Sequence, residues 1–511
     1  MKKPKIKIKF NKKKFKRVML SLLCIVLVAG IVTSSVLFFG GKIDRTRGFD
    51  ISNNGYSFEN SEVKRLISVV PSSRQLAFDE LEYYNFIHYG MNTFTDDEWG
   101  DGTADPHEFN PENVDTDQWC QVLKDSGSKG IIFTAKHHDG FCLWQTEYTD
   151  YSIKNSPYMN GEGDIVKQLA DSCKKYDLKF GIYLSPWDRN NPDYGTDAYN
   201  EYFVNQLTEL CTNYGELFCV WFDGAKGDDV EDFDYDFDRY FDLVHRLQPN
   251  AVTSICGTDV RWIGNEAGSV RESEWSVVPF GTVSVDGTTD LPEITSTSPD
   301  LGSRDLIKDY QNLRWYPAEA DTSIFKSDWF YHDNSKLKSA KELADIYFDT
   351  VGGNASLLLN VPPSKNGIIE ENEVKTLQKF KSIIDETFEN KVDYTVSGDT
   401  SNDTILSGIK DGSESAQLVT GDAMLTFKFD QKEKIKTIVL EEDISKSQRI
   451  EGFEIYAKVP GGYKKVYKGT TIGSKKIVRL NFPYVRNSDE FVIMFTQTRS
   501  YPFIKSIQFY S

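Results

Sequence analysis

The sequence predicts an α/β protein: a (β/α)₈ barrel followed by an all-β sandwich, with a membrane or signal segment at the N-terminus. Three observations lead to this prediction. Short apolar strands alternate with amphipathic helices from about residue 74 to about residue 390. Short alternating runs separated by turn residues follow, from 391 to 511. A basic head and an uncharged, mainly apolar stretch fill residues 1–41, and a polar, Asn/Ser-rich linker is expected over 42–73.

The barrel prediction depends on strands that are apolar on both faces. Such strands, alternating with helices, indicate a parallel sheet, and the number of units favours a closed barrel over an open sheet. No G-x-G-x-x-G follows the first strand, so a dinucleotide-binding fold has no support. The expected strands are Tyr84–Tyr89, Gly130–Lys136, Lys179–Leu184, Leu217–Phe222, Ala251–Ile255, Glu274–Val278 and Ala355–Val361, with a further candidate at Ser327–Tyr331. The expected helices include Asp117–Asp125, Ile165–Tyr176, Ala198–Tyr214, Phe237–Leu247 and Leu337–Val351, and Gly281–Ser303 is expected to be a long loop.

The C-terminal part has the pattern of an antiparallel sandwich, in which short alternating strands are separated by Gly, Asn, Asp and Lys. The expected strands are Ala423–Phe429, Thr437–Glu441, Phe453–Lys458, Lys476–Leu480, Phe491–Thr496 and Ile504–Tyr510.

The stretch Val18–Gly40 is long enough to cross a bilayer as a helix. Ten Lys or Arg residues lie between Lys2 and Arg17 with no acidic residue. This basic flank would remain in the cytoplasm and leave the chain after Lys42 outside. A cleaved signal peptide is the alternative, because small residues such as Ala29 and Ser34 could present a cleavage site. The expected location is therefore the extracellular face of the membrane, or secretion after cleavage.

The charge argues against a nucleic-acid partner, and the cysteine positions argue against a disulfide framework or a cysteine metal site. The net charge is −18, and the remainder of the chain after the basic head has 49 basic against 77 acidic residues. Such an acidic body repels phosphate backbones, which argues against nucleic acid. Six cysteines outside the apolar stretch are scattered without a CxxC, which favours buried thiols over a disulfide framework or a metal site.

Histidines gather where the first two predicted strands end. Functional groups of a (β/α)₈ barrel lie at the C-terminal ends of its strands, and His88, His137 and His138 are three of only six histidines. Adjacent side chains on a strand point to opposite faces, so His137 and His138 make a poor ligand pair. With no H-x-H or H-E-x-x-H motif, neither a metal nor another cofactor is expected.

Asp223 follows the apolar strand residues Val220–Phe222 directly. A carboxylate at the end of a buried strand is costly unless it is paired or used. Two interpretations remain open at this point. Asp223 caps the turn that begins at Gly224, or it is a nucleophile beside an aromatic wall, Trp221, that suits a sugar face.

A retaining glycosidase needs a second carboxyl group, which acts first as an acid and then as a base. Glu266, in the segment Asp259–Gly268, has aromatic and small neighbours of the kind that favour a protonated carboxyl. Glu272 and Glu274 are competitors, but they lie in a charged run typical of a solvated face. The sequence therefore favours Glu266.

The barrel resembles the α-L-fucosidases of glycoside hydrolase family 29. The similar stretches run in order: Phe86–Gly90, Asn92–Gly100 (NTFTDDEWG), Lys136–Phe141 (KHHDGF), Gly181–Asp188 (GIYLSPWD), Trp221–Ala225 (WFDGA), Arg261–Gly268 (RWIGNEAG), Trp315–Ser323 (WYPAEADTS), Asp328–His332 (DWFYH) and Leu357–Pro363 (LLLNVPP). The resemblance covers the barrel only. It implies a metal-independent, exo-acting retaining enzyme that releases α-L-fucose from fucosylated glycans.

The resemblance also implies roles for individual residues. Asp223 is expected to be the nucleophile, and the GNEAG stretch, similar to the branch that prefers α-1,3/1,4-linked fucose, makes Glu266 the acid/base. The expected substrate contacts are His88, Glu98, Trp99, His137, His138, Tyr183, Trp221 and Trp329.

A second sugar site is expected outside the fucose pocket. Trp315, Tyr316, Glu319 and Asp321 are the acidic and aromatic groups that would form it, unless Glu319 and Asp321 merely cap loops. Two other functions stay open: a retaining glycosidase for another α-linked sugar, and a surface adhesin that binds fucosylated glycans without cutting them. The sandwich resembles galactose-binding-like modules, and either bracing of the barrel or glycan binding fits it.

Overall fold

A computed structural model describes residues 41–43, 61–227, 230, 233–272, 274–398, 406–418, 424–480 and 487–511. The apolar stretch Val18–Gly40 lies outside these residues. Within the part of the chain that is described, no helix is both long and apolar enough to cross a membrane.

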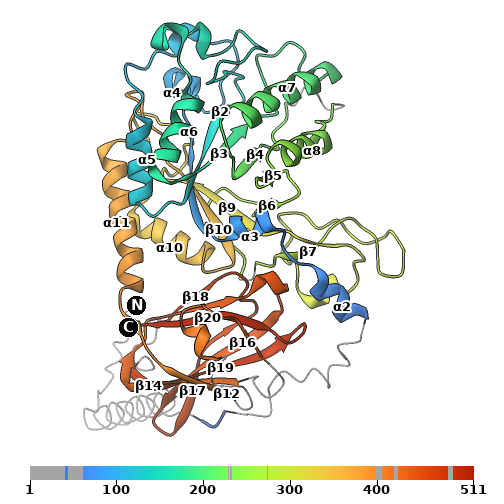
Figure 1. The fold of residues 1–511 in the computed structure, drawn as a ribbon, viewed down its shortest axis with the longest axis vertical. Helices are drawn as coiled ribbons and strands as arrows, with labels where there is room; N and C mark the ends of the chain where they lie inside the picture. The colour runs from blue at the N-terminus through green and yellow to red at the C-terminus, as the bar shows by residue number, and fades with distance from the viewer. Residues whose placement is uncertain are drawn as a thin grey trace, which may run out of the picture.

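Eight parallel strands close into a barrel, which confirms the predicted (β/α)₈ barrel (Figure 1). Going round the barrel, the order is β1-β10-β9-β6-β5-β4-β3-β2. The strands are β1 Tyr83–Ile87, β2 Gly130–Lys136, β3 Lys179–Leu184, β4 Cys219–Phe222, β5 Val252–Ile255, β6 Val260–Trp262, β9 Ala318–Ser323 and β10 Ala355–Asn360.

Amphipathic helices surround the barrel, and several begin at a side chain that accepts a hydrogen bond from the first helical turn. Asp115, Asp164, Asp236 and Ser339 are such N-caps, each of which stabilises its helix by about 1 kcal/mol. The helices are α2 Ser61–Ser68, α3 Ser73–Asp79, α4 Met91–Thr95, α5 Thr116–Asp125, α6 Ile165–Tyr176, α7 Asp197–Asn213, α8 Phe237–Leu247, α9 Arg304–Ile307, α10 Ala340–Thr350 and α11 Glu371–Phe388. Short 3₁₀ turns are η2 Pro106–Glu108, η3 Ile153–Asn155, η4 Tyr158–Gly161, η5 Gly408–Lys410 and η7 Ile444–Lys446.

Two barrel strands differ from the prediction. The sixth and seventh barrel strands are β6 and β9, whereas the predicted strand Glu274–Val278 is wrong for the barrel. Instead, β7 Val277–Pro279 pairs antiparallel with β8 Leu313–Trp315 in a separate two-stranded sheet. β9 escaped detection because Glu319 and Asp321 interrupt the apolar run that marks a buried strand. The candidate Ser327–Tyr331 contains no strand, and Gly281–Ser303 is the expected loop.

The C-terminal region is a β-sandwich, as predicted. One sheet has the order β11-β20-β15-β18 with β13 beside β20, and the other has the order β12-β14-β19-β16-β17. Side chains from both sheets, such as Phe427, Phe453 and Phe509, form one buried core. The strands are β11 Lys391–Val392, β12 Thr395–Gly398, β13 Ala416–Gln417, β14 Met424–Lys434, β15 Thr437–Glu442, β16 Ile450–Val459, β17 Gly462–Gly469, β18 Lys476–Arg479, β19 Asn487–Thr498 and β20 Phe503–Tyr510.

Helix α2 lies within the predicted linker and packs on the barrel domain. Its Val63 and Leu66 are buried. Arg65 donates from Nη1 to the Tyr310 carbonyl at 2.6 Å and from Nη2 to the Ile307 carbonyl at 3.1 Å. The end of the linker region is therefore a docked helix.

The sandwich contacts the segment that connects β6 to β9. Arg499 donates from Nη2 to the Gly302 carbonyl at 2.6 Å, and its guanidinium lies over the Trp275 ring at 4.9 Å. Arg304 donates to the Thr498 carbonyl at 2.7 Å, and the Ser276 amide donates to Gln448 Oε1 at 2.8 Å. The sandwich thus fixes this long connection from one side.

Candidate active site

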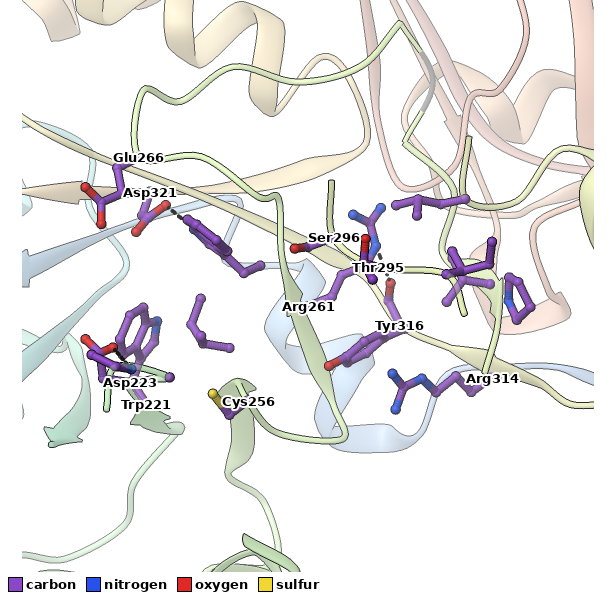
Figure 2. A pocket seen from close by; sticks show the side chains of 18 residues that line it. Trp221, Asp223, Cys256, Arg261, Glu266, Thr295, Ser296, Arg314, Tyr316 and Asp321 are labelled. Atoms are coloured by element: carbon purple, nitrogen blue, oxygen red, sulfur yellow. Dashed lines mark hydrogen bonds between the residues drawn. The ribbon is translucent and has the colours of Figure 1, made fainter. Parts of the chain in front are cut away.

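A cavity of about 540 Å³ lies at the C-terminal ends of β4, β5 and β6 (Figure 2). Figure 2 shows two groups of lining side chains, one around the carboxylates and one beyond them. The catalytic half consists of Trp221, Asp223, Gly224, Ala225, Ile255, Cys256, Trp262, Glu266 and Asp321. The distal half consists of Arg261, Val278, Pro279, Ile294, Thr295, Ser296, Leu301, Arg314 and Tyr316.

Asp223 follows β4, and its two carboxylate oxygens have different surroundings. Oδ1 accepts a hydrogen bond from the Ala225 amide at 2.8 Å. Oδ2 accepts one from the Tyr183 hydroxyl at 3.0 Å and lies 3.8 Å from His138 Nε2. One oxygen therefore caps the turn, as the first interpretation of the sequence predicts, and the other faces the polar groups of the site.

The three strand-end histidines form a buried cluster beside Asp223. The ring centroids of His137 and His138 lie 4.1 Å apart, and those of His88 and His137 lie 5.6 Å apart. The β2–β3 register shifts between Thr134 and Lys136, so simple strand alternation does not separate the consecutive histidines. These residues do not line the cavity itself; they connect to it through Asp223 and Tyr183.

Burial keeps these histidines neutral. It lowers the pKa of His88 to about 3 and lowers the pKa of His137 well below its usual value. It also lowers the pKa of His138, although the negative charge of Asp223 acts in the opposite direction. Their ring Nδ1 atoms lie 2.9 Å from Asn360 Oδ1, 3.3 Å from Asn92 Nδ2 and 2.8 Å from Ser185 Oγ, respectively. Neutral, oriented imidazoles suit hydrogen bonding to hydroxyl groups.

A buried ion pair supports the KHHDGF turn. Lys136 Nζ lies 2.9 Å from Asp188 Oδ2, and both side chains are inaccessible to solvent. Gly140 has φ +87°, and a Cβ there would collide with Asp188, so only glycine fits. Burial raises the pKa of Asp139 in this turn to about 7. The turn that carries His137 and His138 is therefore rigid and tightly packed.

Glu266 lies in the connection after β6 and is exposed, in contrast to the secluded environment that its neighbours in sequence predict. Trp329 Nε1 donates to Glu266 Oε2 at 3.3 Å. Asp321 is the adjacent buried carboxyl group and accepts from Trp262 Nε1 at 2.8 Å. Burial raises the pKa of Asp321 well above its usual range, and the charges of Glu319 and Glu266 add to this shift.

Glu319 lies inside the barrel, so the prediction that it faces a second sugar site or caps a loop is wrong. It is fully buried on β9 and accepts from Trp221 Nε1 at 2.7 Å, from Ser254 Oγ at 3.0 Å and from the Tyr84 hydroxyl. Its role is to orient the Trp221 indole. The prediction is also wrong for Trp315, which is buried against Val277 and Ile444, whereas Tyr316 and Asp321 do line the cavity.

Glu98, Trp99 and Trp329 come together from two loops. Glu98 accepts from the backbone amides of Trp329 at 2.9 Å and Phe330 at 3.3 Å, and from His332 Nε2 at 2.6 Å. Trp329 lies against His88 with a centroid distance of 5.2 Å. Trp99 is 56% exposed and presents its ring to His138 at 6.3 Å. Glu98 thus holds the loop that positions Trp329.

Several site residues escaped the sequence analysis. Asn92, Ser185 and Asn360 each orient a histidine, and Trp262, Arg261 and Arg314 line the cavity. Asn360 is the last residue of β10 and Ser185 follows β3 directly, so their places at strand ends could have identified them. Arg314 had no such signal, because the β7–β8 sheet was not predicted. Ile255, at the end of β5, has φ +67°, an uncommon strain for a β-branched residue that lines a cavity.

The described residues contain no group of three or more His, Cys, Asp or Glu side chains arranged to hold a metal ion. Cys120, Cys142, Cys173, Cys211 and Cys219 are buried free thiols, and Cys256 is half-buried at the cavity.

A family model described as alpha-L-fucosidase matches residues 73–385, more than half of the chain. The chain belongs to the α-L-fucosidase family. This family, glycoside hydrolase family 29, is the one that the sequence motifs indicated, and the protein is a glycoside hydrolase with α-L-fucosidase activity.

Relatives in plants and bacteria agree with this assignment. Alpha-L-fucosidase 1 of Arabidopsis thaliana is 39% identical over 86% of this chain and 87% of its own length. A putative alpha-L-fucosidase of Bacteroides ovatus has a solved structure with 39% identity and a TM-score of 0.77, covering 88% of this chain and 76% of that one. A Ruminococcus gnavus family 29 fucosidase, solved in complex with fucose, has 29% identity and a TM-score of 0.75, covering 87% and 95%.

Proposed function

We propose that the protein is an exo-acting, retaining α-L-fucosidase in which Asp223 is the nucleophile and Glu266 the acid/base. The observation that carries this proposal is that the two carboxyl groups line one cavity from different elements, β4 and the connection after β6. Retaining glycosidases use two such groups about 5–5.5 Å apart on either side of the scissile bond.

In the first step, Asp223 Oδ2 attacks the anomeric carbon of fucose and forms a glycosyl ester. Glu266 donates its proton to the leaving oxygen as the glycosidic bond breaks. In the second step, Glu266 takes a proton from water, the water oxygen bonds to the anomeric carbon, and the ester bond to Asp223 breaks. Fucose leaves with its original anomeric configuration. Tyr183 and His138 flank the attacking oxygen and orient it.

The fucose ring is bound by neutral hydrogen-bonding groups and aromatic faces. His138 lies beside Asp223, and His137 and His88 lie next to it, so these histidines supply ring nitrogens to hydroxyl groups that extend from the cavity past Asp223. Trp221, fixed by Glu319, and Trp329 supply apolar surface. Sugars present hydroxyl groups at ring edges and C–H groups on ring faces, so this combination fits one monosaccharide. Glu98 contributes through the Trp329 loop, and Trp99 offers an exposed aromatic face.

The enzyme prefers α-1,3- or α-1,4-linked fucose on branched acceptors. The support is the cavity itself, which continues from the carboxylates into the distal half and leaves room for a second sugar. Binding energy from that sugar is expressed in the transition state, so truncated substrates lose kcat as well as affinity.

The enzyme acts outside the cytoplasm. The support is the basic head followed by the apolar stretch Val18–Gly40. Protease added to intact cells should digest the barrel if it is anchored outside, and culture medium should contain it if the segment is cleaved. Protection in intact cells and absence from the medium would contradict this location.

The decisive assay incubates the full-length chain with a panel of fucosylated oligosaccharides and measures free fucose by chromatography. We expect fucose release, fastest from branched α-1,3/1,4-fucosylated trisaccharides and slower from α-1,2-linked fucose or an aryl fucoside. Cleavage of an aryl galactoside without fucose release would point to another sugar. Binding of the oligosaccharides without any release would point to an adhesin.

A further inference from the structure

The distal half of the cavity is positively charged. Arg261 and Arg314 line it, and none of its lining residues is acidic. Behind Arg261, the single carboxylate of Glu274 is shared between Arg261 Nη2 at 2.8 Å and Arg271 Nη1 at 3.2 Å. One guanidinium charge is therefore in excess there. Arg261 is 96% buried, and its Nη1 has no hydrogen-bond partner among the described residues.

Arg314 adds a second excess charge. Within the described part of the chain it forms no ion pair with a carboxylate, and its Nε has no hydrogen-bond partner. The whole chain has 77 acidic against 59 basic residues, so carboxylates are abundant elsewhere. A half-buried arginine that lacks a carboxylate partner is costly unless it is used.

Arg314 is also fixed in place. Its guanidinium stacks on the Tyr316 ring at 3.7 Å, and the Tyr316 hydroxyl donates to the Gly257 carbonyl at 2.6 Å. Arg314 lies on β8 opposite Val278 of β7, so the backbone beneath it is paired. Figure 2 shows Arg314 and Tyr316 at the far side of the cavity from Asp223 and Glu266. A cation held in advance loses little conformational entropy when it binds a ligand.

We propose that the distal half of the cavity binds an anionic substituent on the leaving-group part of the glycan, a carboxylate or a sulfate ester, with Arg314 as the main contact. This inference rests on the proposed fucosidase function and gives it a substrate class: fucosylated glycans that are also acidic. Thr295 and Ser296, which line the same half, offer hydroxyl groups to the remaining oxygen atoms of such a substituent.

The experiment compares three substrates that differ only in charge. These are a neutral branched fucosylated trisaccharide, the same trisaccharide with a sulfate on its galactose, and the same trisaccharide with a sialic acid on its galactose. The full-length enzyme and its Arg314→Gln and Arg314→Lys variants are assayed for fucose release at low and high salt. The control variant, Lys308→Gln, removes an exposed positive charge near Asp305 and outside the cavity. Melting temperatures check that each variant is folded.

In the unmodified enzyme we expect kcat/KM to be about tenfold higher for at least one acidic trisaccharide, as one charge-assisted hydrogen bond provides. Salt should reduce this ratio. The ratio should fall to about one in Arg314→Gln, stay partly raised in Arg314→Lys, and be unchanged in Lys308→Gln. A preference for the sulfated or the sialylated substrate alone identifies which anion fits.

Equal or lower kcat/KM for both acidic substrates in the unmodified enzyme would overturn the proposal, whatever the behaviour of the variants. An acidic preference that survives in a folded Arg314→Gln variant would also overturn it. If the proposed fucosidase function itself is wrong, the neutral trisaccharide will release no fucose. That result is distinct from failure of the anion-binding proposal, in which the neutral trisaccharide is still cleaved.

Discussion

The two halves of the cavity are built in different ways. The catalytic half is held by barrel strands: Asp223 follows β4, Trp221 lies on it, and Glu319 on β9 fixes Trp221 from below. Apart from Arg261 on β6, the distal half is built from the connection between β6 and β9, whose regular structure is limited to β7, β8 and the short helix α9. Its support comes from the sandwich, through Arg499 and Arg304. The barrel strands thus hold Asp223 and its neighbours, whereas Glu266 and most of the distal half lie on a connection that the sandwich contacts.

Replacement of Asp223 should have the largest effect and should lower kcat equally for every substrate. Asp223→Asn keeps the size of the side chain and the hydrogen bond from Ala225 but removes the carboxylate that we propose as the nucleophile. We expect kcat to fall by about 10⁴-fold or more on both aryl and oligosaccharide fucosides, as loss of a nucleophile does in other enzymes. Ser296→Ala, in the distal half, is the control on the aryl fucoside. Substantial turnover by Asp223→Asn would break the assignment.

Replacement of Glu266 should separate substrates by their leaving groups. General acid catalysis is worth about 10²–10⁴-fold. In Glu266→Gln, kcat should fall by that amount on oligosaccharides but much less on an aryl fucoside with an acidic phenol, which needs no proton. Added azide should restore the rate of Glu266→Ala. An equal loss on both substrates would remove Glu266 from the acid role.

Replacement of Tyr316 tests whether the distal half contributes only to natural substrates. Tyr316→Ala removes the ring that supports Arg314 and lines the cavity. We expect kcat/KM on a branched oligosaccharide to fall by about tenfold, the equivalent of about 1.4 kcal/mol. Glu319→Gln, which disturbs Trp221 in the catalytic half, is the matched variant and should affect the aryl fucoside to a similar extent as the oligosaccharide. Identical substrate profiles for the two variants would erase the distinction between the halves.

The stability of the folded protein should depend on pH through Asp139, in the turn that carries His137 and His138. Burial raises the pKa of this carboxyl to about 7 from a usual 3.8, so the folded state binds a proton that the unfolded chain releases. The free energy of unfolding should fall as pH rises from about 4 to 7, by up to a few kcal/mol at about 1.4 kcal/mol per pKa unit. Asp139→Asn should show a smaller fall. Denaturant titrations at pH 5 and pH 8 measure this, and an unchanged pH dependence in the variant would contradict it.

Removal of metal ions should have the smallest effect. Neutral imidazoles that hydrogen-bond to Asn92, Ser185 and Asn360 serve as sugar contacts in this account. Prolonged chelator treatment should therefore leave activity within a factor of about two, because a chelator removes metal ions and these contacts need none. A large loss that a divalent ion restores would show that His137 and His138 are ligands.

The sequence alone predicts the parts of the fold whose patterns are local. Apolar strands such as β2 and β3 were predicted at their exact bounds, because both faces are buried along all of β2 and along β3 after Lys179. β6 and β9 were missed because polar residues interrupt them, and the partners of Glu319 and Asp321 are far away in the chain. Glu319, for example, is bonded by Tyr84, which is 235 residues away. Such compensation cannot be seen in a local pattern.

The candidate site shows the same division. Residues at strand ends, such as Asp223 and His138, could be predicted, because barrel geometry gathers strand ends. Arg314 could not, since its position depends on the small β7–β8 sheet and on the path of the connection. The exposure of Glu266 also could not be predicted from the sequence, because aromatic neighbours in sequence do not have to be neighbours in space.

The most direct test of the catalytic assignment is to trap the covalent intermediate. A 2-deoxy-2-fluoro-fucosyl fluoride loses fluoride readily on attack but slows hydrolysis of the glycosyl ester, since fluorine destabilises the oxocarbenium-like transition state. Mass spectrometry of the intact protein, followed by peptide mapping, locates the adduct. We predict one fluorofucosyl group on the peptide that contains Asp223, and none in the Asp223→Asn variant. An adduct on another carboxylate, or release of fucose with inverted configuration, would contradict the account.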